Sequence, residues 1–227
     1  CWAFTGHCAY FTAANCMQWK DCCGCQQACP QLNTYPKTIA ASSVKWNFEH
    51  KKQVFTQLPP ERLTIITPSK WLARWVKESF LSKYPIEVHH NPLDTGIFKP
   101  TPSNFRQRYG LGDKFIVLGV ASPWTKRKGL DVFIDLAREL DPEQYAVGAV
   151  GLSEKQIKQT EGLLMGIPTT QSKQELAEIY TASDVFLNPS IEETYGITVS
   201  EGEACNTSVI VIEGSACAEI AKTAGVI

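Results

Sequence analysis

The chain has 227 residues, of which 44% are hydrophobic and 20% charged, a composition typical of a globular protein with one large or two small domains. The formal net charge of −1 gives no reason to expect a nucleic-acid partner. No apolar run reaches the roughly 18 residues of a membrane span, and no signal peptide is recognisable. Because residue 1 is Cys rather than Met and Ile227 follows no stop signal, we expect a fragment cut at both ends.

The first 36 residues are irregular and rich in cysteine, glutamine and aromatic residues. Seven of the nine cysteines of the chain fall within the first 29 positions. Since the remainder is typical of an intracellular α/β enzyme, thiols or a metal site are favoured over a disulfide framework. Four thiolates could hold tetrahedral zinc, and the candidate ligands are Cys8, Cys16, Cys23 and Cys29. Their spacing matches no common zinc ribbon, so structural zinc, buried thiols and disulfides all stay open.

Between residues 42 and 90 the pattern predicts helix, strand, helix and strand. The predicted bounds are 42–58, 62–67, 69–83 and 86–90. The second helix, which Ser69 would cap, has an apolar stripe flanked by basic residues. Such a helix either lies on an anionic membrane or buries its stripe in a core. We favour the core, and a peripheral membrane contact stays open as the alternative.

Residues 91–113 contain several chain breakers and indicate a linker around a short helix at 104–109. Beyond the linker, apolar strands alternate with helices. The predicted strands are 115–121, 145–150, 163–166, 185–188 and 209–212, and the predicted helices are 129–140, 154–160, 173–182, 196–205 and 216–224. This alternation predicts an α/β fold with a doubly wound, Rossmann-like parallel sheet. Ligands of such sheets bind at the carboxyl ends of the strands, which directs attention to the loops after them.

Residues 184–201 carry the pattern that says most about function. A strand ends at Asn188, the loop after it holds Glu193 and Gly196, and Glu201 lies about one turn into the following helix. Carboxylates accept hydrogen bonds from hydroxyl groups, and a helix N-terminus attracts phosphate. A sugar phosphate satisfies both, and a nucleotide sugar fits especially well.

Several segments resemble the retaining glycosyltransferases of family 4, which have the GT-B fold. Glu193 and Glu201, with seven residues between them, resemble the E-x7-E signature of that family. The run 91–100 resembles its N-G-x-D…F-x-P linker, and 122–129 resembles its loop before Lys-Gly. The opening segment 1–8 is similar to a cysteine-containing subgroup from exopolysaccharide and colanic-acid-type pathways. The resemblance spans essentially the whole chain.

The resemblance implies a role for each charged residue. Glu201 would hold the ribose hydroxyls of a nucleotide, and Glu193 would meet the hydroxyls of the transferred sugar near the reacting carbon. Lys128 would neutralise the departing diphosphate, which needs fixed cations and dipoles more than a metal. Many family members have Arg six residues before this Lys; because Ser122 stands there, either Arg127 takes over a phosphate contact or that contact is lost.

The same resemblance assigns the loop backbone and the domains. Amides around Tyr195, Gly196 and Ile197 would bind the distal phosphate. Residues 1–95 would be the end of the acceptor domain and 96–227 most of the donor-binding domain. The predicted reaction moves a hexosyl unit from a nucleoside diphosphate sugar to a saccharide or lipid-linked saccharide, with retention, in surface polysaccharide synthesis. It would need no catalytic cofactor and would take place in the cytoplasm, at the inner membrane face if the acceptor is a lipid.

Some residues depart from the family pattern. Gly202 would cost helix stability, and Glu203 would need a partner if it faced the core. Asn206 is tolerable, because Asn adopts the left-handed conformation at helix ends. We expect the fragment alone to be inactive. The alternatives are another GT-B enzyme, such as a nucleotide-sugar epimerase, and a degenerate nucleotide-sugar binding protein.

Overall fold

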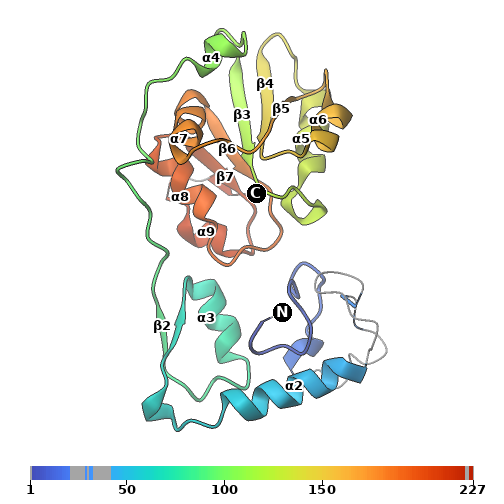
Figure 1. The fold of residues 1–227 in the computed structure, drawn as a ribbon, viewed down its shortest axis with the longest axis vertical. Helices are drawn as coiled ribbons and strands as arrows, with labels where there is room; N and C mark the ends of the chain where they lie inside the picture. The colour runs from blue at the N-terminus through green and yellow to red at the C-terminus, as the bar shows by residue number, and fades with distance from the viewer. Residues whose placement is uncertain (1, 21–28, 30, 33–41, 223–224, 227) are drawn as a thin grey trace. The chain divides into compact units, whose positions relative to one another are not determined.

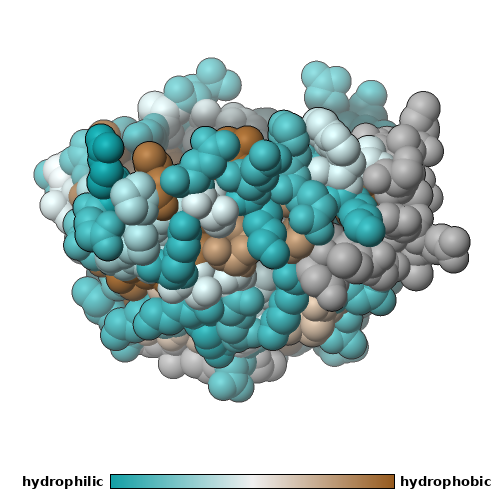
Figure 2. Space-filling model, turned by 90° about the horizontal axis from the view of Figure 1, so that it is seen from below, coloured by the Kyte–Doolittle hydropathy of each residue, from teal (hydrophilic) through white to brown (hydrophobic). Residues whose placement is uncertain are grey.

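The computed structural model describes residues 2–20, 29, 31–32, 42–222 and 225–226. The chain divides into two compact units, Cys1–His90 and Asn91–Ile227, a few residues before the domain boundary expected at 95/96. No helix in the described part of the chain is long and apolar enough to cross a membrane. On the face seen in Figure 2, hydrophilic residues predominate and hydrophobic ones show only as small, separated spots.

The first unit pairs two short parallel strands, β1 (Ile65–Thr67) and β2 (Ile86–Val88), through helix α3 (Lys70–Lys77) (Figure 1). The described residues of this unit also form helix α2 (Ser42–Phe55) and the 3-10 turns η1 (Gln18–Lys20) and η2 (Pro60–Arg62). Ser69 caps α3 as predicted, because its Oγ accepts a hydrogen bond from the Leu72 amide at 3.1 Å. Both helices are shorter than predicted. Helix α3 ends where the Ser79 hydroxyl accepts from the Leu81 amide and turns the chain.

The apolar stripe of α3 packs inside the first unit. Trp71, Leu72 and Val76 are buried. Trp75 meets two aromatic rings of the N-terminal segment edge-on, Phe11 at 5.3 Å and Trp19 at 6.1 Å between ring centroids. The stripe is therefore part of a core, as favoured from the sequence, and α3 does not offer it as a surface for a membrane.

The second unit is built on a parallel sheet of six strands in the order β5-β4-β3-β6-β7-β8. The strands are β3 (Phe115–Val120), β4 (Tyr145–Val150), β5 (Met165–Ile167), β6 (Val185–Asn188), β7 (Ser208–Val211) and β8 (Gly225–Val226). The helices are α4 (Phe105–Arg108), α5 (Leu130–Glu139), α6 (Glu154–Thr160), α7 (Lys173–Ala182), α8 (Ile197–Ala204) and α9 (Ala216–Ile220), with the 3-10 turn η3 (Lys126–Lys128) before α5. The predicted Rossmann-like α/β fold is confirmed.

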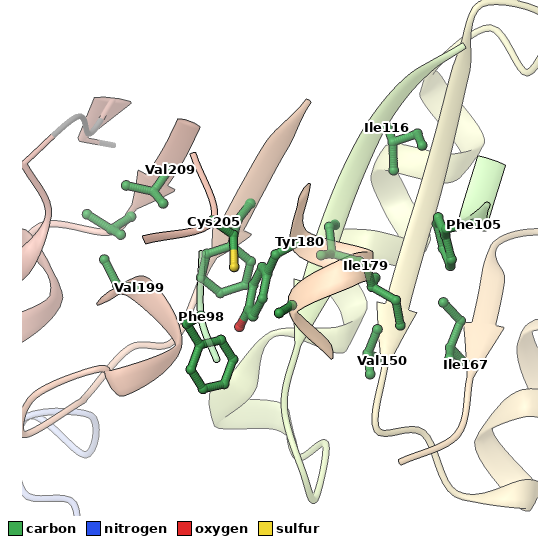
Figure 3. Packing of buried hydrophobic residues seen from close by; sticks show 14 of the residues in the cluster. Phe98, Phe105, Ile116, Val150, Ile167, Ile179, Tyr180, Val199, Cys205 and Val209 are labelled. Atoms are coloured by element: carbon green, nitrogen blue, oxygen red, sulfur yellow. The ribbon is translucent and has the colours of Figure 1, made fainter. Parts of the chain in front are cut away.

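Two buried clusters cover the two faces of this sheet. Alternate residues of a strand point to opposite faces, so Ile116 and Leu118 join one cluster and Val117 the other. The first cluster contains residues of α7 and α8 and is drawn in Figure 3. The second contains Phe133 of α5. The helices thus form a layer on each side of the sheet, and the strand ends are left to the loops.

The chain order makes β3 the turning point of the sheet. From β3 the chain adds β4 and then β5 on one side, and it returns to place β6 on the other side of β3. The connections therefore leave neighbouring strands β3 and β6 in opposite directions. In open α/β sheets this switch point, at the carboxyl ends of the strands, is where ligands bind.

Candidate donor-binding site

The two loops at the switch point are interlocked. Gly129 ends the loop after β3 with φ of 73°, and a Cβ there would lie 2.7 Å from Cγ of Pro189 in the loop after β6. The Ile191 amide donates to the Arg127 carbonyl at 3.1 Å, and Nη1 of Arg127 donates to the Glu192 carbonyl at 2.7 Å. Only glycine fits this close approach, so the Lys-Gly pair seen in the sequence has a packing reason.

The interlock brings together the two residues predicted to be catalytic. The Lys128 ammonium forms an ion pair with Oε1 of Glu193. Nη1 of Arg127 lies 3.7 Å from the same oxygen. The three side chains are 17–24% exposed, so this cluster is largely shielded but still reaches the surface. A pair of this kind presents a hydroxyl acceptor and a phosphate-binding cation side by side.

Helix α8 begins beside this pair. Its N-cap, Gly196, has φ of 82°, and no side chain caps the helix. The first amides of a helix have no partner within it and carry the positive end of its dipole, so they can bind an anion. Tyr195 is buried in the core at 7% exposure, while Ile197 is 36% exposed. Of these predicted residues, the backbone rather than the side chains is suited to a ligand.

Glu201 lies half-buried on the second turn of α8. Its Oε2 accepts a hydrogen bond from the Tyr180 hydroxyl of α7 at 3.3 Å. Burial raises the pKa of Glu201 to about 7, against the lowering effects of the Tyr180 hydrogen bond and the charge of Lys173. Ser122, the remaining predicted residue, is exposed after β3, close to Gly151 at the end of β4.

The sequence did not predict two residues that pack against the loop after β6, Asn188 and Cys217. A Cβ on Gly196 would lie 2.5 Å from Sγ of Cys217 in α9. Asn188 accepts the Ser190 amide at 3.1 Å, and its Nδ2 lies 3.6 Å from the same sulfur. Burial, with the charge of Glu193, raises the pKa of Cys217 to about 12, so this residue is a protonated packing group. No motif marks these contacts, because they depend on strand order.

The departures from the family pattern have local explanations. A Cβ on Gly202 would come within 3.3 Å of the Phe186 ring, so glycine lets α8 approach β6 closely. This close packing offsets the helix stability that glycine is expected to lose. Glu203 is half-buried, and its Oε1 accepts a hydrogen bond from the Lys222 amide at 2.5 Å. This carboxylate therefore has a hydrogen-bond partner. Asn206 adopts φ of 64°, as expected at a helix end.

The predicted zinc ligands are only partly described. Cys8, Cys16 and Cys29 are buried and free of disulfides, and Cys23 lies outside the described residues. Within the described ranges, no three His, Cys, Asp or Glu side chains gather as a metal site. The zinc site stays a prediction, and metal analysis of the purified protein tests it.

Residues 114–227 match the family described as "Glycosyl transferases group 1". The chain belongs to the group 1 glycosyltransferases. Among curated proteins, it is 34% identical over 116 residues to the alpha-galactosylglucosyldiacylglycerol synthase of Streptococcus pneumoniae, covering 46% of this chain and 30% of that protein. It is 28% identical over 159 residues to the processive diacylglycerol alpha-glucosyltransferase of Acholeplasma laidlawii, covering 64% and 47%. The matches thus cover 30% and 47% of the length of these two relatives.

Solved glycosyltransferase structures share the fold at low identity. HepE of Anabaena, in complex with UDP and glucose, superposes with a TM-score of 0.62 at 17% identity, over 80% of this chain and 53% of that one. A glycosyltransferase from Rickettsia africae superposes with a TM-score of 0.66 at 16% identity, over 86% and 64%. These likenesses support the GT-B assignment of this group 1 chain.

Proposed function

We propose that this chain carries the donor-binding part of a retaining hexosyltransferase that uses a nucleoside diphosphate sugar. The observation that carries the proposal is the Lys128–Glu193 pair at the switch point, beside the uncapped start of α8. The carboxylate would accept hydroxyls of the sugar, while the ammonium and the helix amides would bind the diphosphate. The similarity to HepE, solved with UDP and glucose, supports such a donor.

The same cluster suits the chemistry of glycosyl transfer. When the anomeric C–O bond breaks, its electron pair goes to the diphosphate oxygen, and the sugar carbon becomes oxocarbenium-like. Lys128 and the α8 amides would stabilise the charge on the leaving oxygen. The acceptor hydroxyl oxygen then bonds to that carbon, and its proton passes to the departing diphosphate oxygen. The acceptor would be a saccharide or a lipid-linked saccharide. The names of two relatives contain diacylglycerol, a membrane lipid, which supports an acceptor at a membrane. The reaction would then take place at the cytoplasmic face of that membrane.

The test is donor hydrolysis by the full-length protein with a panel of nucleoside diphosphate hexoses. NMR would follow the anomer of the released sugar within minutes, before mutarotation. Release with retained configuration, lost in Glu193→Gln, is the expected result. An epimerised nucleotide sugar would instead indicate an epimerase, and tight binding without turnover would indicate a degenerate binding protein. Either outcome would overturn the proposal.

A further inference from the structure

Tyr180, whose hydroxyl donates to Glu201, lies outside the segments that resemble the family motifs. This hydrogen bond joins the last turn of α7 to the second turn of α8. We propose that Tyr180 is a positioning residue of the donor site, whose hydroxyl fixes the Glu201 carboxylate for a ribose and so sets a preference for ribonucleotides over 2′-deoxyribonucleotides. This inference rests on the proposed function.

The Tyr180 ring is packed in the core of the second unit. Its side chain is completely buried, and it meets Phe186 of β6 edge-on, with ring centroids 5.3 Å apart. Phe98 of the linker and Cys205, the C-cap of α8, belong to the same buried cluster (Figure 3). The Tyr180 carbonyl accepts the Thr207 hydroxyl at 2.7 Å, which anchors the backbone as well. A ring packed in this way cannot change rotamer without opening the core, so the position of its hydroxyl is fixed.

The Tyr180 hydroxyl is a permanent donor. Burial raises the pKa of this phenol well above its usual value, and the nearby Glu201 charge acts in the same direction. The proton therefore stays on the phenol oxygen at any physiological pH. Its hydrogen bond holds Oε2 of Glu201, and the carboxylate cannot rotate away from that position without leaving a buried donor unpaired.

A fixed, half-buried carboxylate suits the ribose of a nucleotide. A site that is built to hydrogen-bond a hydroxyl rejects a ligand without that hydroxyl, because its own polar group is then left unpaired. Rejection weakens when the carboxylate is free to turn toward solvent. Removing the Tyr180 hydroxyl should thus reduce discrimination between the two sugars more than it reduces binding of the diphosphate.

The ionisation of Glu201 provides a second readout. The titratable groups facing it are Tyr180 and Lys173 from α7 and Cys205 at the C-terminal cap of α8. Both the Tyr180 hydrogen bond and the Lys173 charge lower the pKa of Glu201. Ribose affinity should fall as the pH drops and Glu201 takes up a proton. Loss of the Tyr180 hydroxyl should move the midpoint of this fall to higher pH.

The experiment uses the full-length protein and calorimetry. A panel of UDP-, GDP-, ADP- and dTDP-glucose identifies the donor that binds tightest, and its 2′-deoxy analogue is then compared with it across pH 5.5–8.5. Wild type should favour the ribose form by about tenfold. Tyr180→Phe keeps the ring and should lower this ratio to about two- or threefold, with the pH midpoint raised. In a Glu201→Gln background, Tyr180→Phe should change the ratio no further.

Tyr84→Phe is the matched control. Tyr84 lies in the first unit, and its hydroxyl donates to the Phe55 and Leu58 carbonyls at 3.0 and 2.9 Å. This variant should lose thermal stability and keep both the ratio and the pH midpoint. An unchanged ratio in Tyr180→Phe, or tightest binding of dTDP-glucose by wild type, would overturn the inference while the proposed function stands. Binding of no nucleotide sugar would count against both.

Discussion

Replacing Gly196 by Ala should destabilise the second unit through two separate effects. The backbone has φ of 82°, a conformation that costs a non-glycine residue about 1–2 kcal/mol. The new Cβ would also stand 2.5 Å from the buried sulfur of Cys217, and overpacking of this kind costs about 1–3 kcal/mol. We therefore expect a loss of about 2–5 kcal/mol in the free energy of unfolding, measured by urea denaturation with circular dichroism.

Two variants separate the effects. Gly162 has a similar φ of 75°, but open space surrounds the position of a Cβ, so Gly162→Ala should show the backbone cost alone. Adding Cys217→Ala to Gly196→Ala removes the clashing sulfur and should recover about 1–3 kcal/mol. If Gly196→Ala cost no more than Gly162→Ala, or if the second substitution gave no recovery, the close approach under α8 would not be the reason for glycine at this position.

Three further predictions concern charge. Lys128→Met should lower donor-hydrolysis activity by about 100-fold, because a cation beside the leaving phosphate is lost, while exposed Lys126→Met should leave it unchanged. Arg106→Ala removes hydrogen bonds to a carboxylate and three backbone carbonyls and should lower the free energy of unfolding by about 2 kcal/mol, measured by thermal denaturation. Arg108 is exposed, so Arg108→Ala is the control and should keep near-wild-type stability. The pKa of Glu201 is raised in the folded state from 4.5 to about 7, so its protonated form stabilises the fold below pH 4.5. This contribution is lost as the pH rises to 7. Glu201→Gln should therefore flatten the dependence of the unfolding free energy on pH between 4.5 and 7.

The regular elements of the second unit were predictable because their signals are local. Continuous apolar runs and helix caps determined β4, α6, α7 and β6 with the observed bounds. Helix ends were less predictable. The helix from 69 was expected to reach 83 but ends at Lys77, because a serine side chain turns the chain just beyond it. Periodicity in the sequence continues past this point and gives no warning.

The site was predictable as a set of residues but not as a set of contacts. The Glu193 and Lys128 motifs lie 65 positions apart, and only the placement of β6 beside β3 makes them an ion pair. The partnership of Tyr180 with Glu201 depends in the same way on how α7 packs against α8. Such pairings follow from strand order and helix packing, which residue types alone do not encode.

The close fit of Gly129 against Pro189 means that the two switch-point loops must evolve together. A larger residue at either position would push the loops apart and separate the charges that they hold. Across homologous sequences, residues at 129 and 189 should therefore change together or not at all. A chimera that exchanges one loop for that of a relative should lose the site, and one that exchanges both should keep it.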